Sequence, residues 1–143
     1  MTSALLDSNV LLSGAVGFPR RESTPGALLR LWRADAFELV SSIHILGEVR
    51  RALATPYFRQ RITPAQAGRF IALLTRRARV VEITAHVAGV ASHPEDDLVL
   101  SAALTARVDF LVTGDRALQE LRTYERIRIV APAAFLKILD TPA

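Results

Sequence analysis

The sequence predicts an α/β fold, a three-layer α/β/α sandwich with a central, mainly parallel sheet of about five strands. Short apolar runs of strand length alternate along the chain with longer amphipathic segments of helix length. Half of the 143 residues are apolar, which is enough to bury a sheet between two layers of helices. The chain has no internal repeat and no low-complexity linker. We therefore expect residues 1–143 to form a single domain.

Five short segments have the length and the residue types of β-strands. They are residues 4–6, 37–40, 80–83, 110–112 and 127–130. The segment 110–112 is continuously apolar, which is typical of a strand that is buried on both faces. Because helix-length segments separate the strands, consecutive strands are expected to run parallel.

Helices fill the intervals between these strands. The first begins around Val10, after a polar turn, and glycine and proline end it: Gly14, Gly17 and Pro19. Thr24 and Pro25 start the second, with proline in its first turn. Ser41 and Ser42 can cap the third. Its buried stripe is expected to consist of Ile43, Leu46, Val49, Ala52 and Leu53.

The second half of the chain contains further helix starts. Thr63 and Pro64 begin a helix whose last turn is rich in arginine, as suits the negative end of a helix dipole. Its inward residues are expected to be Phe70, Ile71, Leu73 and Leu74. Residues 92–95 resemble a capping box with an early proline and open a helix that ends at Ala106. A short helix over 117–121 and a last one from Pro132 to about Leu139 follow.

Composition limits the possible partners and the location. The net charge of +4 comes almost entirely from arginine, which suits phosphate recognition, although a GC-rich coding bias explains the same content. The chain has no cysteine, which excludes disulfides and thiolate metal sites. It has neither the roughly 20 apolar residues of a membrane span nor a signal peptide. We therefore expect a cytoplasmic protein without membrane contact.

Acidic residues from four separate segments converge on one edge of the expected sheet. Asp7 directly follows the first strand, and Asp115 comes just after the fourth. Because ligands bind beyond the carboxyl ends of parallel strands, both side chains are expected at this edge. Asp96 and Asp97 lie in the first turn of the preceding helix, and Glu48 borders the buried stripe of its own helix.

A cluster of carboxylates is typical of a site for a hard divalent cation. Neighbouring carboxylates raise one another's pKa values, and a bound cation removes that penalty. A ligand set of oxygen atoms favours Mg²⁺ or Mn²⁺ over zinc. Such an ion can activate a water molecule, and a second ion can stabilise the leaving oxygen. The expected reaction is therefore the hydrolysis of a phosphodiester bond.

Each acidic residue also has a purely structural interpretation. Asp7 can cap a helix, and Asp115 can belong to a turn. Glu95 and Asp96, in a first helical turn, are favoured by the helix dipole alone, and Glu48 can be a solvated helix residue. It is the joint placement that favours a metal site. The histidines show no ligand spacing and are interpreted as surface or capping residues: His44, His86 and His93.

These acidic segments resemble those of PIN-domain ribonucleases. Residues 5–11 (Leu-Leu-Asp-Ser-Asn-Val-Leu) are similar to the opening of the family, where threonine or serine and then asparagine follow an aspartate. Residues 45–49 look like the segment of the family's helical glutamate. Residues 94–100 and 111–115 are similar to its third and fourth acidic motifs. The resemblance covers nearly the whole chain and is strongest to the VapC-like toxins of toxin–antitoxin pairs.

The resemblance implies an activity and a set of roles. It implies cleavage of single-stranded RNA with Mg²⁺ or Mn²⁺ and inhibition by a cognate antitoxin, often with dimers. The implied metal ligands are Asp7, Glu48, Asp97 and Asp115. Hydrogen bonds from Asn9 and Thr113 would orient these ligands.

The sequence departs from the family pattern at two positions. Ser8 stands where threonine is commoner, and His93 stands where this branch often has an aspartate. The second departure leaves Asp96 and Asp97 open as the third ligand, although counting back from Asp115 favours Asp97. A homodimer through apolar helix stripes is also open, because core packing explains these stripes equally well: residues 28–32 and 70–74.

Three other functions have different sequence requirements. A dehalogenase-like phosphatase needs a second aspartate where this chain has Asn9. It also needs a positioned lysine, and the only lysine of the chain is Lys137 near the C-terminus. A non-catalytic RNA- or protein-binding module of the same fold would not need all four acidic positions. A housekeeping RNA-processing nuclease would use the same chemistry without an antitoxin.

Overall fold

The computed structural model describes residues 1–141 and contains a six-stranded sheet in the order β3-β2-β1-β4-β6-β5. The strands are β1 (Ser3–Leu6), β2 (Glu38–Ser42), β3 (Arg79–Val81), β4 (Phe110–Val112), β5 (Thr123–Tyr124) and β6 (Ile127–Val130). Neighbouring strands are parallel except for β5 and β6. The mainly parallel sheet is thus confirmed, with one strand more than predicted. β5 has only two residues, too few to show an alternating pattern.

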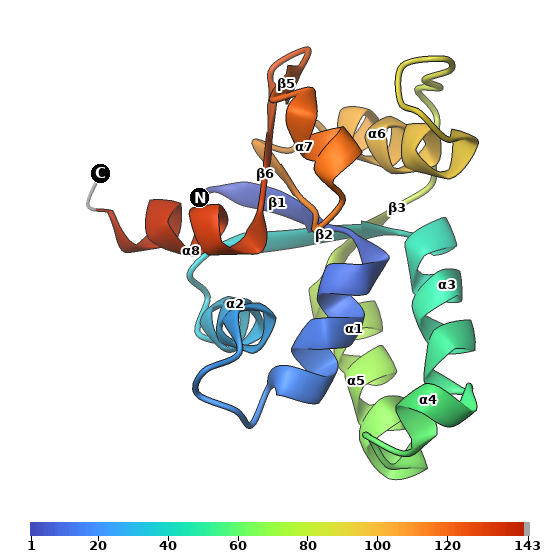
Figure 1. Cartoon of the computed structure of the whole chain (residues 1–143), viewed down its shortest axis with the longest axis vertical. Helices are drawn as coiled ribbons and strands as arrows, with labels where there is room; N and C mark the ends of the chain where they lie inside the picture. Colours follow the sequence, from blue (N-terminus) through green and yellow to red (C-terminus); the bar gives the residue numbers. More distant parts are fainter. Residues whose placement is uncertain (142–143) are drawn as a thin grey trace.

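Helices cover both faces of this sheet, as the sequence predicts. They are α1 (Ser8–Gly17), α2 (Thr24–Arg33), α3 (Ile43–Leu53), α4 (Pro56–Arg59), α5 (Pro64–Arg77), α6 (Pro94–Ala106), α7 (Arg116–Glu120) and α8 (Pro132–Asp140). Figure 1 shows α1, α2, α3 and α5 below the sheet and α6 and α7 above it. The short α4, which the sequence analysis does not predict, follows α3 directly.

Helix starts agree with the sequence at most positions. The hydroxyl of Ser42 caps α3, and Thr63 forms a capping box with Gln66 at the start of α5. The predicted capping box at residues 92–95 is wrong. His93 occupies the N-cap position of α6 without a side-chain capping bond, and Glu95 instead lies near His44 of α3.

The first helix is longer than predicted. It begins at Ser8, within the segment expected as a turn, and it continues through Gly14 to Gly17. These glycines lie where α1 crosses α2. A Cβ atom on Gly14 would lie 2.6 Å from Cδ1 of Leu29, and one on Gly26 would collide with the carbonyl of Gly17. Gly14 therefore serves close helix packing inside α1, whereas α1 does end at Gly17, as predicted.

Two predicted helix stripes differ from the structure in detail. Ile43 is 60% exposed, because it is the first residue of α3 and faces away from the sheet. The buried residues of α3 are Ile45, Leu46, Val49 and Leu53. In α5 only Leu74 is fully buried, and the other three expected residues are half-buried.

The apolar stripe 28–32 belongs to the core of the molecule. Leu28, Leu29 and Trp32 are at most 4% exposed, so core packing accounts for this stripe. The C-terminal helix packs onto the same core through Phe135, whose ring contacts those of Phe37 and Phe110. Within residues 1–141, no helix has the length and apolarity needed to cross a membrane.

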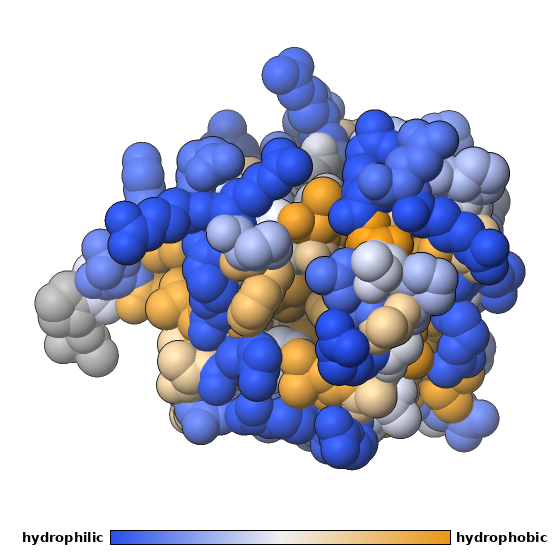
Figure 2. All heavy atoms as spheres, turned by 90° about the horizontal axis from the view of Figure 1, so that it is seen from below, coloured by the Kyte–Doolittle hydropathy of each residue, from blue (hydrophilic) through white to orange (hydrophobic). Residues whose placement is uncertain are grey.

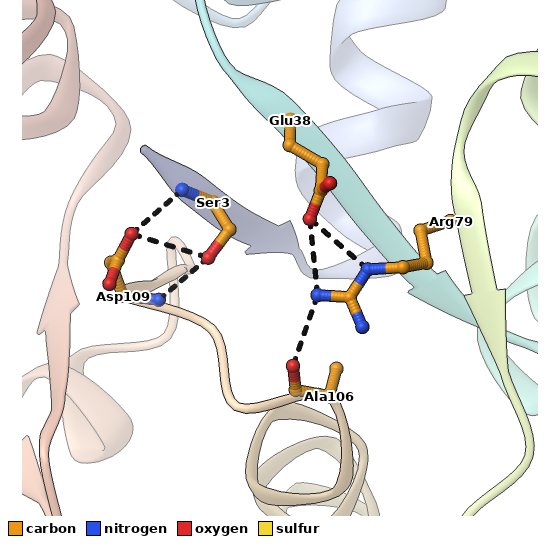
Figure 3. A network of polar contacts seen from close by, with 5 residues as sticks. All are labelled: Ser3, Glu38, Arg79, Ala106 and Asp109. Atoms are coloured by element: carbon orange, nitrogen blue, oxygen red, sulfur yellow. Dashed lines mark hydrogen bonds and ion pairs between the residues drawn. The ribbon is translucent and has the colours of Figure 1, made fainter. Parts of the chain in front are cut away.

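Polar contacts at the amino ends of the strands fix their register (Figure 3). The carboxylate of Asp109 accepts hydrogen bonds from the N–H and the hydroxyl of Ser3, whose hydroxyl in turn accepts the N–H of Asp109. Arg79 binds Glu38 and also donates to the carbonyl of Ala106. The contacts between Ser3 and Asp109 join β1 to the segment before β4. Because β1 and β4 are parallel neighbours, their carboxyl ends also lie next to each other.

Candidate metal centre

Asp7 occupies the position immediately after β1, at the carboxyl edge of the sheet. It is the N-cap residue of α1, and its Oδ1 accepts the N–H of Ser8 at 2.7 Å. Its Oδ2 accepts the hydroxyl of Thr113 at 2.9 Å. Burial raises the pKa of this carboxyl; its hydrogen bonds oppose the rise, and repulsion from Asp115 adds to it. The structure therefore holds a carboxylate rigidly where negative charge is unfavourable.

Thr113 connects Asp7 to Asp115. It is fully buried just after β4, and its hydroxyl accepts the backbone N–H of Asp115 at 3.1 Å while donating to Asp7. The carboxylate of Asp115 caps α7 by accepting the N–H of Leu118 at 3.1 Å. The side chain of Gln119 donates to the carbonyl of Thr113 at 2.7 Å. One hydroxyl thus sets the relative position of two acidic residues.

The two aspartates at the start of α6 have different environments. Asp97 is 8% exposed and accepts the backbone N–H groups of Gly89, Val90 and Ala91 at 3.0, 3.2 and 2.8 Å. Burial raises the pKa of Asp96, and repulsion from Asp115 and from Asp7 raises it further. Asp96 thus interacts electrostatically with Asp7 and Asp115, whereas the carboxylate of Asp97 is engaged by backbone N–H groups. Which of the two is a metal ligand stays a prediction.

A polar stripe on α6 explains where Asp97 points. Asp97, Ser101 and Thr105 follow one another at four-residue spacing, so they lie on one face of the helix. The hydroxyl of Ser101 accepts the N–H of Val87, and that of Thr105 accepts the N–H groups of residues 84 and 85. This face holds the irregular segment 84–91 against the helix, and the neighbouring face carries Asp96.

Glu48 borders the acidic pocket from α3. Burial raises the pKa of Glu48, and repulsion from Glu95 and Asp7 adds to the rise, whereas His44 and Arg51 lower it. Nε2 of His44 lies 3.6 Å from Oε1 of Glu48 and 3.4 Å from Oε2 of Glu95. From sequence alone, His44 and Glu95 have structural interpretations and no role in a site. The four-residue spacing of His44 and Glu48 was a signal for their contact, whereas Glu95 arrives from a distant helix.

Asn9 is placed differently from Thr113. It is exposed on the first turn of α1, and within residues 1–141 no hydrogen bond joins its side chain to one of the acidic residues. The expectation that Asn9 orients a metal ligand stays a prediction.

The chemistry of the donors fits a divalent cation. Asp7, Asp96 and Asp115 gather carboxylate oxygens at one edge of the sheet, with Glu48 beside them. Within residues 1–141, no arginine or lysine forms an ion pair with these four residues. Apart from His44 beside Glu48, their negative charge is thus not balanced by an ion pair, and a hard cation with oxygen ligands would balance it.

Fold and pocket together define a class of α/β proteins with a carboxylate cluster at the carboxyl edge of a parallel sheet. A family model described as PIN domain matches residues 3–117. The chain belongs to the PIN-domain family. Proteins of this family are typically nucleases, and they generally use divalent metals.

Solved structures share this fold. VapBC2 from Rickettsia felis, solved with a DNA fragment from its promoter, is 13% identical, with a TM-score of 0.60 over 91% of this chain and 98% of that chain. VapC20 of Mycobacterium tuberculosis, described as a toxin that cleaves the sarcin-ricin loop, is 17% identical, with a TM-score of 0.53 over 87% and 98%. At these identities the likeness shows the fold. No curated protein matches the sequence.

Proposed function

We propose that this chain is a divalent-metal-dependent endoribonuclease that hydrolyses single-stranded RNA as the toxin of a toxin–antitoxin pair. The observation that carries the proposal is the mutual repulsion of Asp7, Asp96 and Asp115 at the carboxyl edge of the sheet, where within residues 1–141 none of them forms an ion pair with arginine or lysine. Residues 1–143 would act as one domain in the cytoplasm. β6 lies beyond the family match at residues 3–117 and yet pairs with β4, which supports a single unit.

In this proposal, four residues hold Mg²⁺ or Mn²⁺: Asp7, Glu48, Asp96 and Asp115. The bound ion would supply an activated water molecule and would stabilise negative charge on the phosphate. Thr113 fixes the oxygen of Asp7 and the backbone of Asp115, so the pocket is arranged before the ion or substrate binds. Asp97 is assigned to holding the segment 84–91, since its carboxylate already accepts three N–H groups.

Arginine beside the pocket supports a nucleic-acid substrate. The guanidinium group of Arg51 lies close enough to Glu48 to lower the pKa of that carboxyl. A guanidinium group at this position can bind a backbone phosphate on either side of the scissile bond. A phosphate contact of this kind carries no base preference, so it supports RNA binding in general and not a particular target.

An apolar groove that contains none of the acidic pocket residues supports a protein partner. A groove of about 440 Å³ lies between α1, α2 and α5, with Phe18, Trp32 and Phe70 among its apolar lining. Four arginines also line it: Arg33, Arg61, Arg69 and Arg76. Figure 2 shows this end of the molecule, with apolar surface lying between hydrophilic side chains. The charge favours an acidic amphipathic segment. We propose the cognate antitoxin as its source, since the VapBC2 structure is named as a pair.

The central test is hydrolysis of a labelled single-stranded RNA by purified protein with Mg²⁺ or Mn²⁺. Asp7→Asn and Asp115→Asn should abolish cleavage, and Asp140→Asn, which changes an exposed residue of α8, should not. Full activity of Asp7→Asn, or undiminished activity in excess EDTA, would show that the proposed chemistry is wrong.

A second test separates the toxin from its alternatives. Induced expression of the wild type, but not of Asp7→Asn, should stop growth, and a short neighbouring gene should restore it. Nuclease activity without growth arrest would point to a housekeeping RNA-processing nuclease. RNA or protein binding without cleavage would point to a non-catalytic module.

A further inference from the structure

A second group of potential metal ligands lies beside the acidic pocket. His44 and Glu48 are four residues apart and share one face of α3, and Glu95 faces them from the first turn of α6. Figure 1 shows the starts of these two helices on the same side of the molecule. One potential ligand atom of each residue lies within 4.8 Å of the other two.

The hydrogen bond between His44 and Glu95 and the contact between His44 and Glu48 are both long, which leaves room for a shared cation. Nε2 of His44 is 3.4 Å from Glu95 and 3.6 Å from Glu48, longer than the roughly 2.7–3.2 Å of ordinary N–H···O bonds. A single Nε2–H group also cannot point along both directions. A tetrahedral ion with bonds of about 2.1 Å places its ligand atoms about 3.4 Å apart.

The charges point the same way. Glu48 and Glu95 are two carboxylates facing one imidazole, and within residues 1–141 neither forms an ion pair with arginine or lysine. Glu95 is 71% exposed and His44 and Glu48 about one-third exposed, so water can complete the coordination of an ion.

We propose that His44, Glu48 and Glu95 form a binding site for a divalent transition-metal ion of the zinc type, next to the all-carboxylate pocket. An imidazole ligand distinguishes the two sites, because nitrogen suits Zn²⁺ and its neighbours in the transition series and is a poor ligand for Mg²⁺. The two sites share Glu48 alone. The zinc site does not depend on nuclease activity, since it is defined by ligand atoms on α3 and α6.

The test is calorimetric titration of Zn²⁺ into the metal-free full-length protein without Mg²⁺, since Mg²⁺ in the carboxylate pocket would compete for the shared Glu48. The wild type should bind one Zn²⁺ per chain. His44→Gln and Glu95→Gln should each weaken binding by at least about tenfold. His86→Gln is the matched control, because it removes an exposed histidine outside the group. Thermal unfolding in EDTA should show the same melting temperature for all four proteins.

Asp115→Asn separates this proposal from the proposed nuclease. It removes a residue of the carboxylate pocket and should leave zinc affinity within about twofold of the wild type. Zinc binding that is absent from the wild type, unchanged in His44→Gln, or lost in Asp115→Asn would overturn the site. Full RNA cleavage by Asp7→Asn would overturn the proposed chemistry of the carboxylate pocket and leave the zinc site standing.

Discussion

Replacing Asp96 and Asp97 by asparagine, one at a time, should have opposite effects on stability and on metal binding. Asp97 accepts three backbone N–H groups from the segment 84–91. In Asp97→Asn, one oxygen can still accept two of them, but the new amide group faces the N–H of Gly89, donor against donor. Asp96→Asn removes a charge that lies among other carboxylates and leaves those backbone bonds intact.

The size of the Asp97 effect follows from the lost contact. Leaving one partly buried N–H group without its charged acceptor costs about 2 kcal/mol. Unfolding entropy near 2.1 cal/mol/K per residue, over 143 residues, converts this loss into a fall of about 7 °C in melting temperature. Asp96→Asn should leave the melting temperature of the metal-free protein unchanged or higher, because repulsion with Asp115 and Asp7 is removed.

The assay is thermal unfolding by circular dichroism in EDTA and again with saturating Mn²⁺. The wild type and Asp97→Asn should gain similar stability from Mn²⁺, since both keep the proposed ligands. Asp96→Asn should lose most of that gain. The reverse pattern, with Asp97→Asn unaltered in EDTA and no longer stabilised by Mn²⁺, would refute the assignment of Asp96 to the pocket.

Two further predictions concern this pocket, and a third concerns the packing of α1 against α2. Thr113→Val should lower the free energy of unfolding by about 2 kcal/mol and reduce RNA cleavage, because the Asp7 carboxylate and the Asp115 N–H both lose their partner. Urea unfolding and a cleavage assay measure these two effects. Wild-type values in both assays would contradict the prediction. Because the pKa of Asp7 is raised above 3.8, the folded state binds its proton more tightly than the unfolded chain. In EDTA, the stabilisation from Asp7 is therefore complete below pH 3.8 and is lost as pH rises through the raised pKa. Urea unfolding at several pH values gives the difference in unfolding free energy between the wild type and Asp7→Asn, which should show this loss. A difference that does not change with pH would contradict the prediction. Gly26→Ala should lower the free energy of unfolding by at least about 2 kcal/mol, because the new methyl group collides with α1. Gly68→Ala, which has open space on α5, should raise it by up to about 1 kcal/mol. Equal melting temperatures of the two variants would contradict these predictions.

Sequence reasoning was most successful where position depends on local structure. Asp7 and Asp115 each follow a strand that is recognisable from its apolar residues, and parallel strands bring their ends to one edge. The strand after residue 122 was too short to recognise. Gly14 looked like a helix breaker, because only the contact with Leu29 of the next helix explains a glycine there.

Sequence spacing favours Asp97 as the third ligand, whereas the proposed function assigns Asp96 to the pocket. Adjacent helix residues differ by about 100° in direction, so an error of one residue exchanges a pocket position for a packed one. The decisive information is the course of segment 84–91, which has no regular secondary structure and no periodicity. His44 and Glu95 are likewise distant in sequence, and their contact depends on how α3 and α6 lie across the sheet.

In this chain, carboxylates with a structural role have hydrogen-bond or ion-pair partners that offset their charge, whereas those of the proposed metal site repel one another. Arg79 neutralises Glu38, Ser3 binds Asp109, and three N–H groups hold Asp97, so each of these charges has a partner that folding supplies. The carboxylates around Asp7 and Glu48 are positioned by hydroxyl, N–H and histidine groups but are left with mutual repulsion. Such repulsion destabilises the metal-free fold. A bound cation would remove it, so metal binding and stability should rise together at this edge of the sheet.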